Sequence, residues 1–213
     1  MLTTFQNNIL IWWGNNKRIF PWRETRDPYK ILCSEILLQQ TNAEKVVQVY
    51  NKIISDYPEP ADLSEAETAD LEEIIKPLGL LKRAGRLKKI AAEITQKYDG
   101  IIPADKKALI KLPGVGNYTA NAVMCFAFEK QVGVLDTNTI RILARVFDIK
   151  SDKARPRNDK NLQNQLNKVI PKNKSKIFNY ALLDFAALIC TAENPNCGKC
   201  VISRICFSYS NKE

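Results

Sequence analysis

Histidine is absent from all 213 residues of this chain. Its absence removes the commonest general base and metal ligand, and with them every Ser/His or Cys/His catalytic arrangement. Proton transfer must therefore fall to Asp, Glu, Lys, Tyr or Cys. Long apolar runs are missing too, because Ile9–Trp13 is soon interrupted and no later segment approaches the roughly 20 apolar residues of a membrane span. We therefore expect an intracellular protein with neither a membrane segment nor a secretory signal.

Positive charge is in excess. The chain has 32 Lys and Arg against 23 Asp and Glu, a net charge of +9. A basic protein of this size commonly meets an anionic polymer. Its 45% hydrophobic content is enough to bury a core. Six cysteines in a reducing compartment need a purpose other than cross-linking.

Apolar spacing predicts helices along most of the chain, and no run alternates as strands do. The expected helices cover residues 3–13, 30–56 with a break near 39–42, 82–98, 105–112, 118–128, 137–147, 162–169 and 176–188, and Leu63–Glu65 is expected to open one more. In the first of these, Phe5, Ile9 and Trp12 or Trp13 share one side. The fold class is therefore predicted to be all-α.

Leu112–Ala120 combines a proline with two glycines between two predicted helices. Glycine allows a tight turn and a close backbone approach, and the start of the following helix offers N–H groups to a phosphate. We therefore predict a helix, a hairpin and a second helix, with a turn at Gly114, Val115 and Gly116 that suits a phosphate. By itself this stretch is equally compatible with an ordinary turn between helices.

Cys190, Cys197, Cys200 and Cys206 follow the pattern C-x6-C-x2-C-x5-C. Four thiolates this close can surround one zinc ion or a [4Fe–4S] cluster. Zinc sites usually show two C-x2-C pairs, and only the middle pair has that spacing here. The pattern favours the cluster, with zinc and unmetallated thiols as alternatives. Cys33 and Cys125 lie among apolar residues and are expected to be buried small hydrophobes.

The hairpin, an aspartate 18 positions after Tyr118 and the cysteine pattern occur together, in this order. In this combination the chain resembles the helix-hairpin-helix (HhH-GPD) DNA glycosylases of the endonuclease III superfamily. Four further segments are similar to the branch that holds the MutY adenine glycosylases and the Mig-type G·T mismatch thymine glycosylases. They are Phe20–Arg23, Arg26–Tyr29, Ser34–Thr41 and Val134–Asn138.

The resemblance implies two helical lobes with a DNA cleft between them. A six-helix barrel at residues 22–133 would carry the hairpin, and residues 1–21 plus 134–213 would form the iron–sulfur domain with its cluster loop at 190–206. The implied partner is double-stranded DNA containing a mismatched or damaged base. We expect a monomer in a prokaryotic cytoplasm, associated with the nucleoid, with an abasic-site endonuclease as a possible downstream partner.

Three residues receive catalytic roles from the resemblance. Asp136 would stabilise positive charge developing on the sugar, although an aspartate before a helix also suits an N-cap. Tyr118 stands where strand-cutting relatives have a lysine nucleophile, which implies a monofunctional enzyme with little or no lyase activity. Glu35, in an apolar run, would have a raised pKa and protonate a departing adenine, or position water or base for thymine. An ion pair with an arginine is the alternative for Glu35.

Gln39 and Gln40 resemble the wedge that fills the gap left by a flipped base. A polar break between helices explains them as well. The basic stretch 82–89 fits either a DNA groove or a solvated face.

The identity of the target base is predicted from weaker sequence features. Adenine enzymes of this branch usually have a further domain after the cysteines, whereas this chain stops soon after Cys206, which favours thymine or uracil opposite guanine. Asp136–Asn138 favours the same reading, while Leu38–Thr41 resembles the adenine group, so adenine opposite guanine or 8-oxoguanine is the alternative. A non-catalytic DNA-binding or redox-sensing module is a third possibility, which the presence of both Glu35 and Asp136 opposes.

Overall fold

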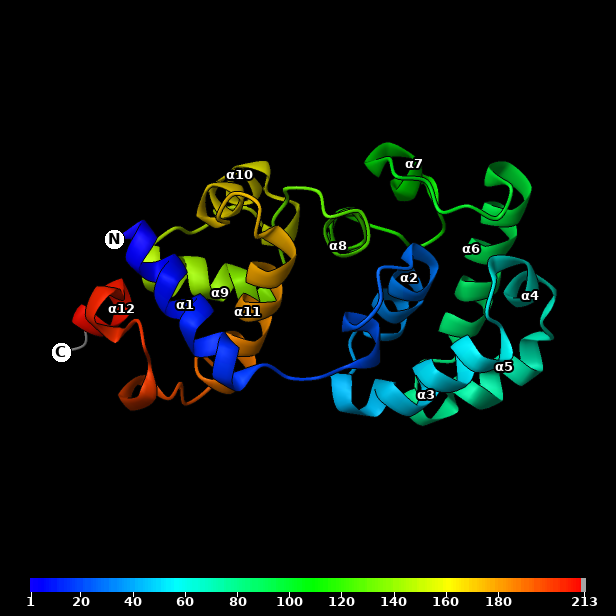
Figure 1. Cartoon of the computed structure of the whole chain (residues 1–213), viewed down its shortest axis with the longest axis horizontal. Coiled ribbons are helices and arrows are strands. Elements are labelled where there is room, and N and C mark those ends of the chain that lie inside the picture. The colour runs from blue at the N-terminus through cyan, green and yellow to red at the C-terminus, as the bar shows by residue number, and fades with distance from the viewer. Residues whose placement is uncertain (212–213) are drawn as a thin grey trace. The chain divides into compact units, whose positions relative to one another are not determined.

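The computed structural model describes residues 1–211, which form two compact units (Figure 1). The terminal unit joins residues 1–18 to the segment from residue 129 onward, and the central unit is residues 19–128. The described residues contain helices and no strand, so the predicted all-α class is confirmed. None of their helices has the length and apolar character to cross a membrane. The predicted domain boundaries near 22 and 133 stay a prediction.

The central unit is built around one buried helix, α2, which packs against α3, α6 and α8. Eight of its ten residues are buried, and a helix that is apolar on nearly every side belongs in a core. The helices of this unit are α2 (Pro28–Leu37), α3 (Ala43–Asp56), α4 (Pro60–Glu65), α5 (Thr68–Ile75), α6 (Lys82–Tyr98), α7 (Lys106–Lys111) and α8 (Asn117–Phe126), with 3₁₀ turns at Pro21–Arg23 and Lys76–Leu78.

Capping determines where these helices begin. Asp27 Oδ1 accepts from the Tyr29 N–H at 2.9 Å, and Pro28 occupies the first position of α2. The expected helix start at Leu63–Glu65 is wrong, because these residues end α4 instead. That helix starts earlier, with Pro60 at its first position and Asp62 Oδ2 accepting from the Glu59 N–H at 3.0 Å.

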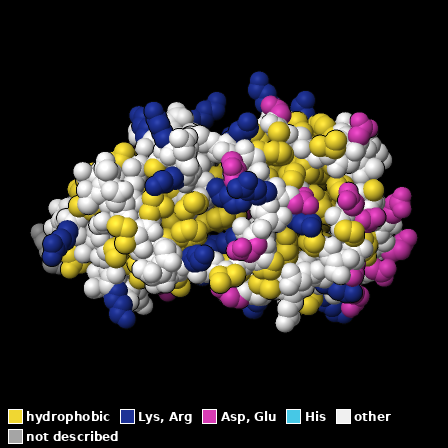
Figure 2. Space-filling model, in the orientation of Figure 1, with side chains coloured by type: hydrophobic (Ala, Val, Ile, Leu, Met, Phe, Trp, Pro, Cys, Tyr) yellow, Lys and Arg dark blue, Asp and Glu magenta, His cyan; other side chains and the backbone are white. Residues whose placement is uncertain are grey.

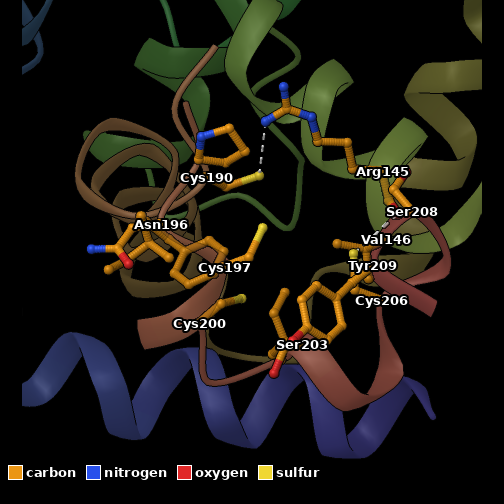
Figure 3. A pocket seen from close by; sticks show the side chains of 14 residues that line it. Arg145, Val146, Cys190, Asn196, Cys197, Cys200, Ser203, Cys206, Ser208 and Tyr209 are labelled. Carbon is orange, nitrogen blue, oxygen red and sulfur yellow. Dashed lines mark hydrogen bonds between the residues drawn. The ribbon is translucent and has the colours of Figure 1, made fainter. Parts of the chain in front are cut away.

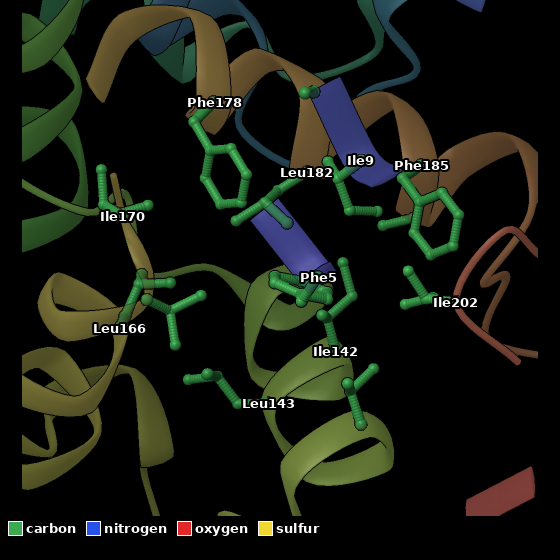
Figure 4. Packing of buried hydrophobic residues seen from close by; sticks show 14 of the residues in the cluster. Phe5, Ile9, Ile142, Leu143, Leu166, Ile170, Phe178, Leu182, Phe185 and Ile202 are labelled. Carbon is green, nitrogen blue, oxygen red and sulfur yellow. The ribbon is translucent and has the colours of Figure 1, made fainter. Parts of the chain in front are cut away.

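The terminal unit has its own apolar core, to which α1 and α11 contribute facing side chains (Figure 4). Phe5, Ile9 and Trp12 of α1 are buried. The Trp12 and Phe185 rings pack edge to face, with their centroids 5.2 Å apart. This unit contains α1 (Leu2–Asn16), α9 (Thr137–Phe147), α10 (Lys160–Val169), α11 (Ser175–Leu188) and α12 (Phe207–Ser210), with 3₁₀ turns at Pro156–Asn158, Cys197–Lys199 and Ser203–Ile205.

A buried carboxylate fixes the end of α1 to α11. Asp184, fully buried, accepts from Trp13 Nε1 at 2.8 Å and from Arg18 Nε at 2.7 Å. The Arg18 backbone N–H donates to the same side chain at 3.1 Å. Pairing and hydrogen bonding offset the desolvation of this charge, so the N-terminal segment is held within the terminal unit.

Candidate functional site

The predicted hairpin is formed by α7, residues 112–116 and α8. Gly114 has φ +73°, and a Cβ built there would lie 2.5 Å from Cδ of Arg86. The backbone conformation favours glycine at this position, whereas the flexible end of the Arg86 side chain would have to move to admit a Cβ. Gly116 differs, because its φ of −94° is open to any residue and its Cβ would meet nothing within 4 Å. Val115 is buried and anchors the turn, with its N–H donating to Leu112 O at 3.1 Å.

The start of α8 faces outward. No side chain caps this end, where Gly116 is the N-cap residue and Gly116 and Asn117 are both exposed. The positive end of an uncapped helix suits a phosphate oxygen. Tyr118, in the first turn, is partly exposed, and no lysine occupies that turn.

Glu35 lies on α2, which packs against α8. It is only 4% exposed, and Asn121 of α8 is 1% exposed. Buried polar side chains on two packed helices are unusual in an apolar core and mark a candidate functional region. Asn121 was missed at the sequence level because it lies in an otherwise apolar helical run.

The break after α2 is a turn held from inside the central unit. Gln40 adopts φ +58°, a left-handed conformation that is strained for a side chain of this kind. Arg83, 1% exposed, donates to Leu37 O at 2.8 Å, to Thr41 Oγ1 at 2.6 Å and to Gln39 O. One buried guanidinium therefore satisfies three acceptors of the turn that presents Gln39 and Gln40.

Arg86 connects this turn to the hairpin. Its Nη1 donates to Gln39 Oε1 at 2.6 Å, and its side chain is the group that a Cβ at Gly114 would strike. The predicted wedge and the predicted phosphate-binding turn therefore contact one arginine.

Asp136 is the N-cap residue of α9 in the terminal unit. Its Oδ1 accepts from the Thr139 N–H at 2.7 Å, its Oδ2 accepts from Asn138 Nδ2 at 2.6 Å, and its own N–H donates to Thr139 Oγ1 at 2.9 Å. Desolvation raises the pKa of Asp136, while the hydrogen bonds from Thr139 and Asn138 oppose that rise. The carboxylate is both a cap and a group fixed in one orientation.

A hydrogen-bond network runs from Asp136 along α9 to the cysteine loop. Asn138 Oδ1 accepts from Arg141 Nη2 at 3.1 Å, and Arg141 Nε donates to Cys190 O at 2.8 Å. One turn further on, Arg145 donates to Thr191 O at 2.6 Å. The helix that positions the candidate catalytic carboxylate is therefore fixed to the first predicted metal ligand.

All four predicted cysteine ligands line one cavity of about 270 Å³ (Figure 3). Arg145 Nη1 donates to Cys190 Sγ at 3.5 Å. Burial raises the pKa of the Cys200 thiol to about 11. Cys33 and Cys125 are buried in the central unit, as predicted.

No three candidate ligands within residues 1–211 are close enough together to hold a single metal ion. Tetrahedral zinc, with Zn–S bonds of about 2.3 Å, needs sulfurs roughly 3.8 Å apart. A polynuclear cluster spreads its thiolates more widely, because several metal atoms lie between them. The four cysteines that line the cavity are the donor type that iron–sulfur clusters use.

The family model for "HhH-GPD superfamily base excision DNA repair protein" matches residues 33–172. The chain belongs to this superfamily. The resemblance inferred from the hairpin, Asp136 and the cysteines is thereby confirmed. In the endonuclease III superfamily a [4Fe–4S] cluster is typical.

Curated relatives match almost the whole chain. A thymine/uracil-DNA glycosylase of Pyrobaculum aerophilum is 38% identical over 99% of this chain and 94% of its own length. A thymine-DNA glycosylase of Aeropyrum pernix is 42% identical over 90% of this chain and 87% of its own. An adenine DNA glycosylase of Mycobacterium tuberculosis is 37% identical over 91% of this chain and 64% of its own.

Solved structures agree with the fold. A thermostable thymine-DNA glycosylase superposes with a TM-score of 0.93 at 38% identity, covering 99% of this chain and 97% of that one. An endonuclease III–DNA complex superposes with a TM-score of 0.84 at 26% identity, covering 96% and 93%. The predicted glycosylase fold is confirmed.

Proposed function

We propose that this HhH-GPD protein is a monofunctional DNA glycosylase of base excision repair that removes thymine or uracil opposite guanine and leaves an abasic site. The main support for this proposal is the nearly full-length match, in sequence and fold, to thymine and thymine/uracil glycosylases. Its substrate is double-stranded DNA with a mismatched base. The monomeric state, the nucleoid-associated location and a downstream abasic-site endonuclease stay predictions.

Asp136 is the proposed catalytic carboxylate. Breaking an N-glycosidic bond places positive charge on the deoxyribose, and a fixed negative group beside the sugar stabilises that charge. The hydrogen bonds from Thr139 and Asn138 hold both carboxylate oxygens in place before the reaction begins. An ionised Asp136 also orients the water that attacks the sugar.

Glu35 and Tyr118 are the other proposed catalytic residues. The burial of Glu35 on α2 supports a role in holding water or the departing base, since a buried carboxyl in an apolar region is kept for a purpose other than solvation. Tyr118 has no amine with which to form a Schiff base, which supports release of the base by water alone.

The central unit is proposed to hold DNA by shape and by backbone groups. Gly114, Val115, Gly116 and the uncapped start of α8 would bind a phosphate whatever the sequence. Gln39 and Gln40 would fill the space left by the extruded nucleotide. The rigid support from Arg83 suits a wedge, which must resist the stacked bases it displaces.

Cys190, Cys197, Cys200 and Cys206 are proposed to hold a [4Fe–4S] cluster. When bound, the cluster supplies covalent cross-links within the loop and no reagent for base release. Arg145 supports the loop by donating to Cys190 Sγ and to Thr191 O.

Adenine is the second candidate substrate. The relative from M. tuberculosis is nearly as similar to this chain, and Leu38–Thr41 resembles the adenine group. In that case Glu35 would protonate the departing purine.

One panel of duplexes tests the proposal. Strands that bear G·T, G·U, G·A or 8-oxoguanine·A are incubated with the holoprotein and analysed with and without alkali. We expect alkali-dependent cleavage of the thymine and uracil strands and little cleavage without alkali. Cleavage of the adenine strands alone would show that adenine, and not thymine or uracil, is the substrate. Strand cleavage without alkali, together with a covalent protein–DNA complex trapped by borohydride, would show lyase activity.

A further inference from the structure

A cavity of about 550 Å³ lies in the terminal unit between the first turn of α9 and the 3₁₀ turn Pro156–Asn158. We call it the arginine pocket. Its walls combine two guanidinium groups with hydroxyl, amide and apolar side chains. The residues that line the pocket are Thr137, Ile140, Ala154, Arg155, Pro156, Arg157 and Asn158.

The two arginines of the pocket have no side-chain partner within residues 1–211. Arg155 and Arg157 are exposed, and neither guanidinium makes a hydrogen bond or an ion pair with any described residue. Arg141 and Arg145 of the same unit, by contrast, donate to backbone carbonyls of the cysteine loop. A guanidinium carries five N–H donors in a planar fork that matches carboxylate and phosphate oxygens. Two guanidinium groups whose N–H donors have no acceptor among the described residues favour an anionic ligand at this cavity.

The loop that bears these arginines is fixed at its base. Asp159, 6% exposed, accepts from Ser151 Oγ at 2.6 Å and from the Asn161 N–H at 2.9 Å. These hydrogen bonds, the one from Ser151 first, hold the pKa of Asp159 below its usual value, so the anchor stays ionised. Because the loop is already closed, little ordering free energy is spent when a ligand binds.

The pocket is adjacent to the candidate catalytic group. Thr137, which lines it, directly follows Asp136, and both lie at the positive end of the α9 dipole. Asp136 accepts from the Thr139 N–H, and Arg155 and Arg157 add positive charge at the pocket. A deoxyribose within a DNA strand is esterified to one phosphate at its 5′ oxygen and to another at its 3′ oxygen. The pocket borders the first turn of α9 through Thr137 and Ile140, and Asp136 caps that same turn.

We propose that the arginine pocket binds a phosphodiester of the DNA strand close to the nucleotide that loses its base. The inference rests on the proposed function. It assigns Arg155 and Arg157 as DNA-binding residues outside the hairpin and the cysteine loop. The contact adds affinity through counterion release and keeps the sugar near Asp136.

Salt dependence gives the first test. The double variant R155Q/R157Q is compared with K52Q/K97Q on a fully paired duplex, which needs no base release. Lys52 and Lys97 are exposed and already paired with Asp56 and Glu93, so the control removes the same two charges from neutralised sites. We expect the slope of log K against log salt to fall in magnitude by about 1–2 for the arginine variant only. Equal slopes for the two variants would overturn the proposal.

Single-phosphate neutralisation locates the contact. A duplex with a stable abasic analogue opposite guanine receives one uncharged methylphosphonate at successive positions in either strand. Near the analogue, one substitution should weaken the wild type about tenfold and leave R155Q/R157Q almost unaffected, because the variant no longer makes the contact that the substitution removes. Additive losses at every position would refute the contact. So would a variant that loses only its preference for guanine, because the pocket would then read a base.

Both measurements are equilibrium binding and do not depend on catalysis. Failure of the wild type to release any base from the G·T and G·U duplexes would remove the proposed function while leaving a phosphate-coupled pocket intact. Normal base release with additive binding losses would instead remove the pocket alone.

Discussion

Of the 32 lysines and arginines, 17 belong to the terminal unit and 15 to the central unit, whereas the 23 acids divide 8 to 15. The net charge of +9 therefore resides entirely in the terminal unit, and the central unit is neutral as a whole. Within the central unit, Asp56–Glu73 contains eight acids and no lysine or arginine. Figure 2 shows acidic side chains gathered over the α4 and α5 end of this unit.

The contrast separates two ways of holding DNA. The terminal unit offers long-range attraction, with two arginines in the pocket that Thr137, the residue after Asp136, also lines. The central unit offers shape, with two backbone turns at positive φ, Gln40 and Gly114, supported by Arg83 and Arg86. Changes in the terminal unit should act on chemistry and salt dependence, and changes in the central unit on stability and mismatch recognition.

Replacing a cysteine in each unit should separate them most sharply. Cys197→Ala removes a proposed cluster ligand of the terminal unit, and loss of a metal site commonly unfolds the structure built on it. We expect loss of the visible iron–sulfur absorption and of protease protection in the terminal unit. Cys125→Ala, at a buried cysteine of the central unit, is the matched control and should cost about 1 kcal/mol of unfolding free energy while keeping the cluster. Equal absorption and protection in both variants would refute the cluster.

Asp136→Asn should lower single-turnover base release about 10²- to 10⁴-fold while DNA affinity is kept. Asparagine is a good N-cap, so α9 should remain formed. Normal base release by this variant would exclude Asp136 as the catalytic carboxylate and leave the capping role alone.

The raised pKa of Asp136 sets the sign of two pH effects. Base release needs the ionised form, so its rate should fall as pH decreases through a pKa above the ordinary aspartate value of about 3.9. Stability has the opposite sign, because the folded state holds this proton more tightly than the unfolded state and so loses stability as pH rises from about 3.9 through the raised pKa. Asp136→Asn should therefore be at least as stable as the wild type at neutral pH, which thermal unfolding at two pH values would check.

Most helices of the fold could be predicted from local sequence patterns. The break after α2, the extent of α6 and the hairpin between α7 and α8 follow from spacing, proline and glycine, which act within a few residues. The helix start near Leu63 was wrong for a local reason as well, since proline at the first position and Asp62 at the third outweighed the apolar residue.

The supporting contacts of the candidate site could not be read from the sequence. Arg83 looked like one charge in a solvated basic stretch, and its acceptors lie 42 to 46 positions away. In the link from Asn138 through Arg141 to Cys190, the contact between Arg141 and Cys190 likewise spans 49 positions. Periodicity carries no information about such partners, because a buried arginine and an exposed one obey the same helical spacing.

Arg83→Met should test the shape-based half of the comparison. The change keeps much of the side-chain volume but leaves the buried acceptors of the turn without a donor, at about 1–3 kcal/mol for each unsatisfied group. We expect a loss of roughly 2–4 kcal/mol in unfolding free energy, measured in urea, with the salt dependence of DNA binding nearly unchanged. Arg86→Met, which loses one hydrogen bond to the Gln39 side chain, is the matched control with a smaller loss. Equal losses would show that the turn does not depend on Arg83.

The smallest effect on stability should come from Gln40, where shape and function oppose each other. Gln40→Gly relieves the positive φ of 58° at the cost of greater freedom in the unfolded chain, so the unfolding free energy should change by less than about 1 kcal/mol. The same variant removes an amide that the proposed wedge needs, so base release from G·T should fall more than binding to paired DNA. Gln40→Asn keeps an amide and tolerates this backbone conformation, and it should retain more activity than glycine. Equal activity of the two variants would mean that the DNA contacts the backbone of the turn and not the side chain at position 40.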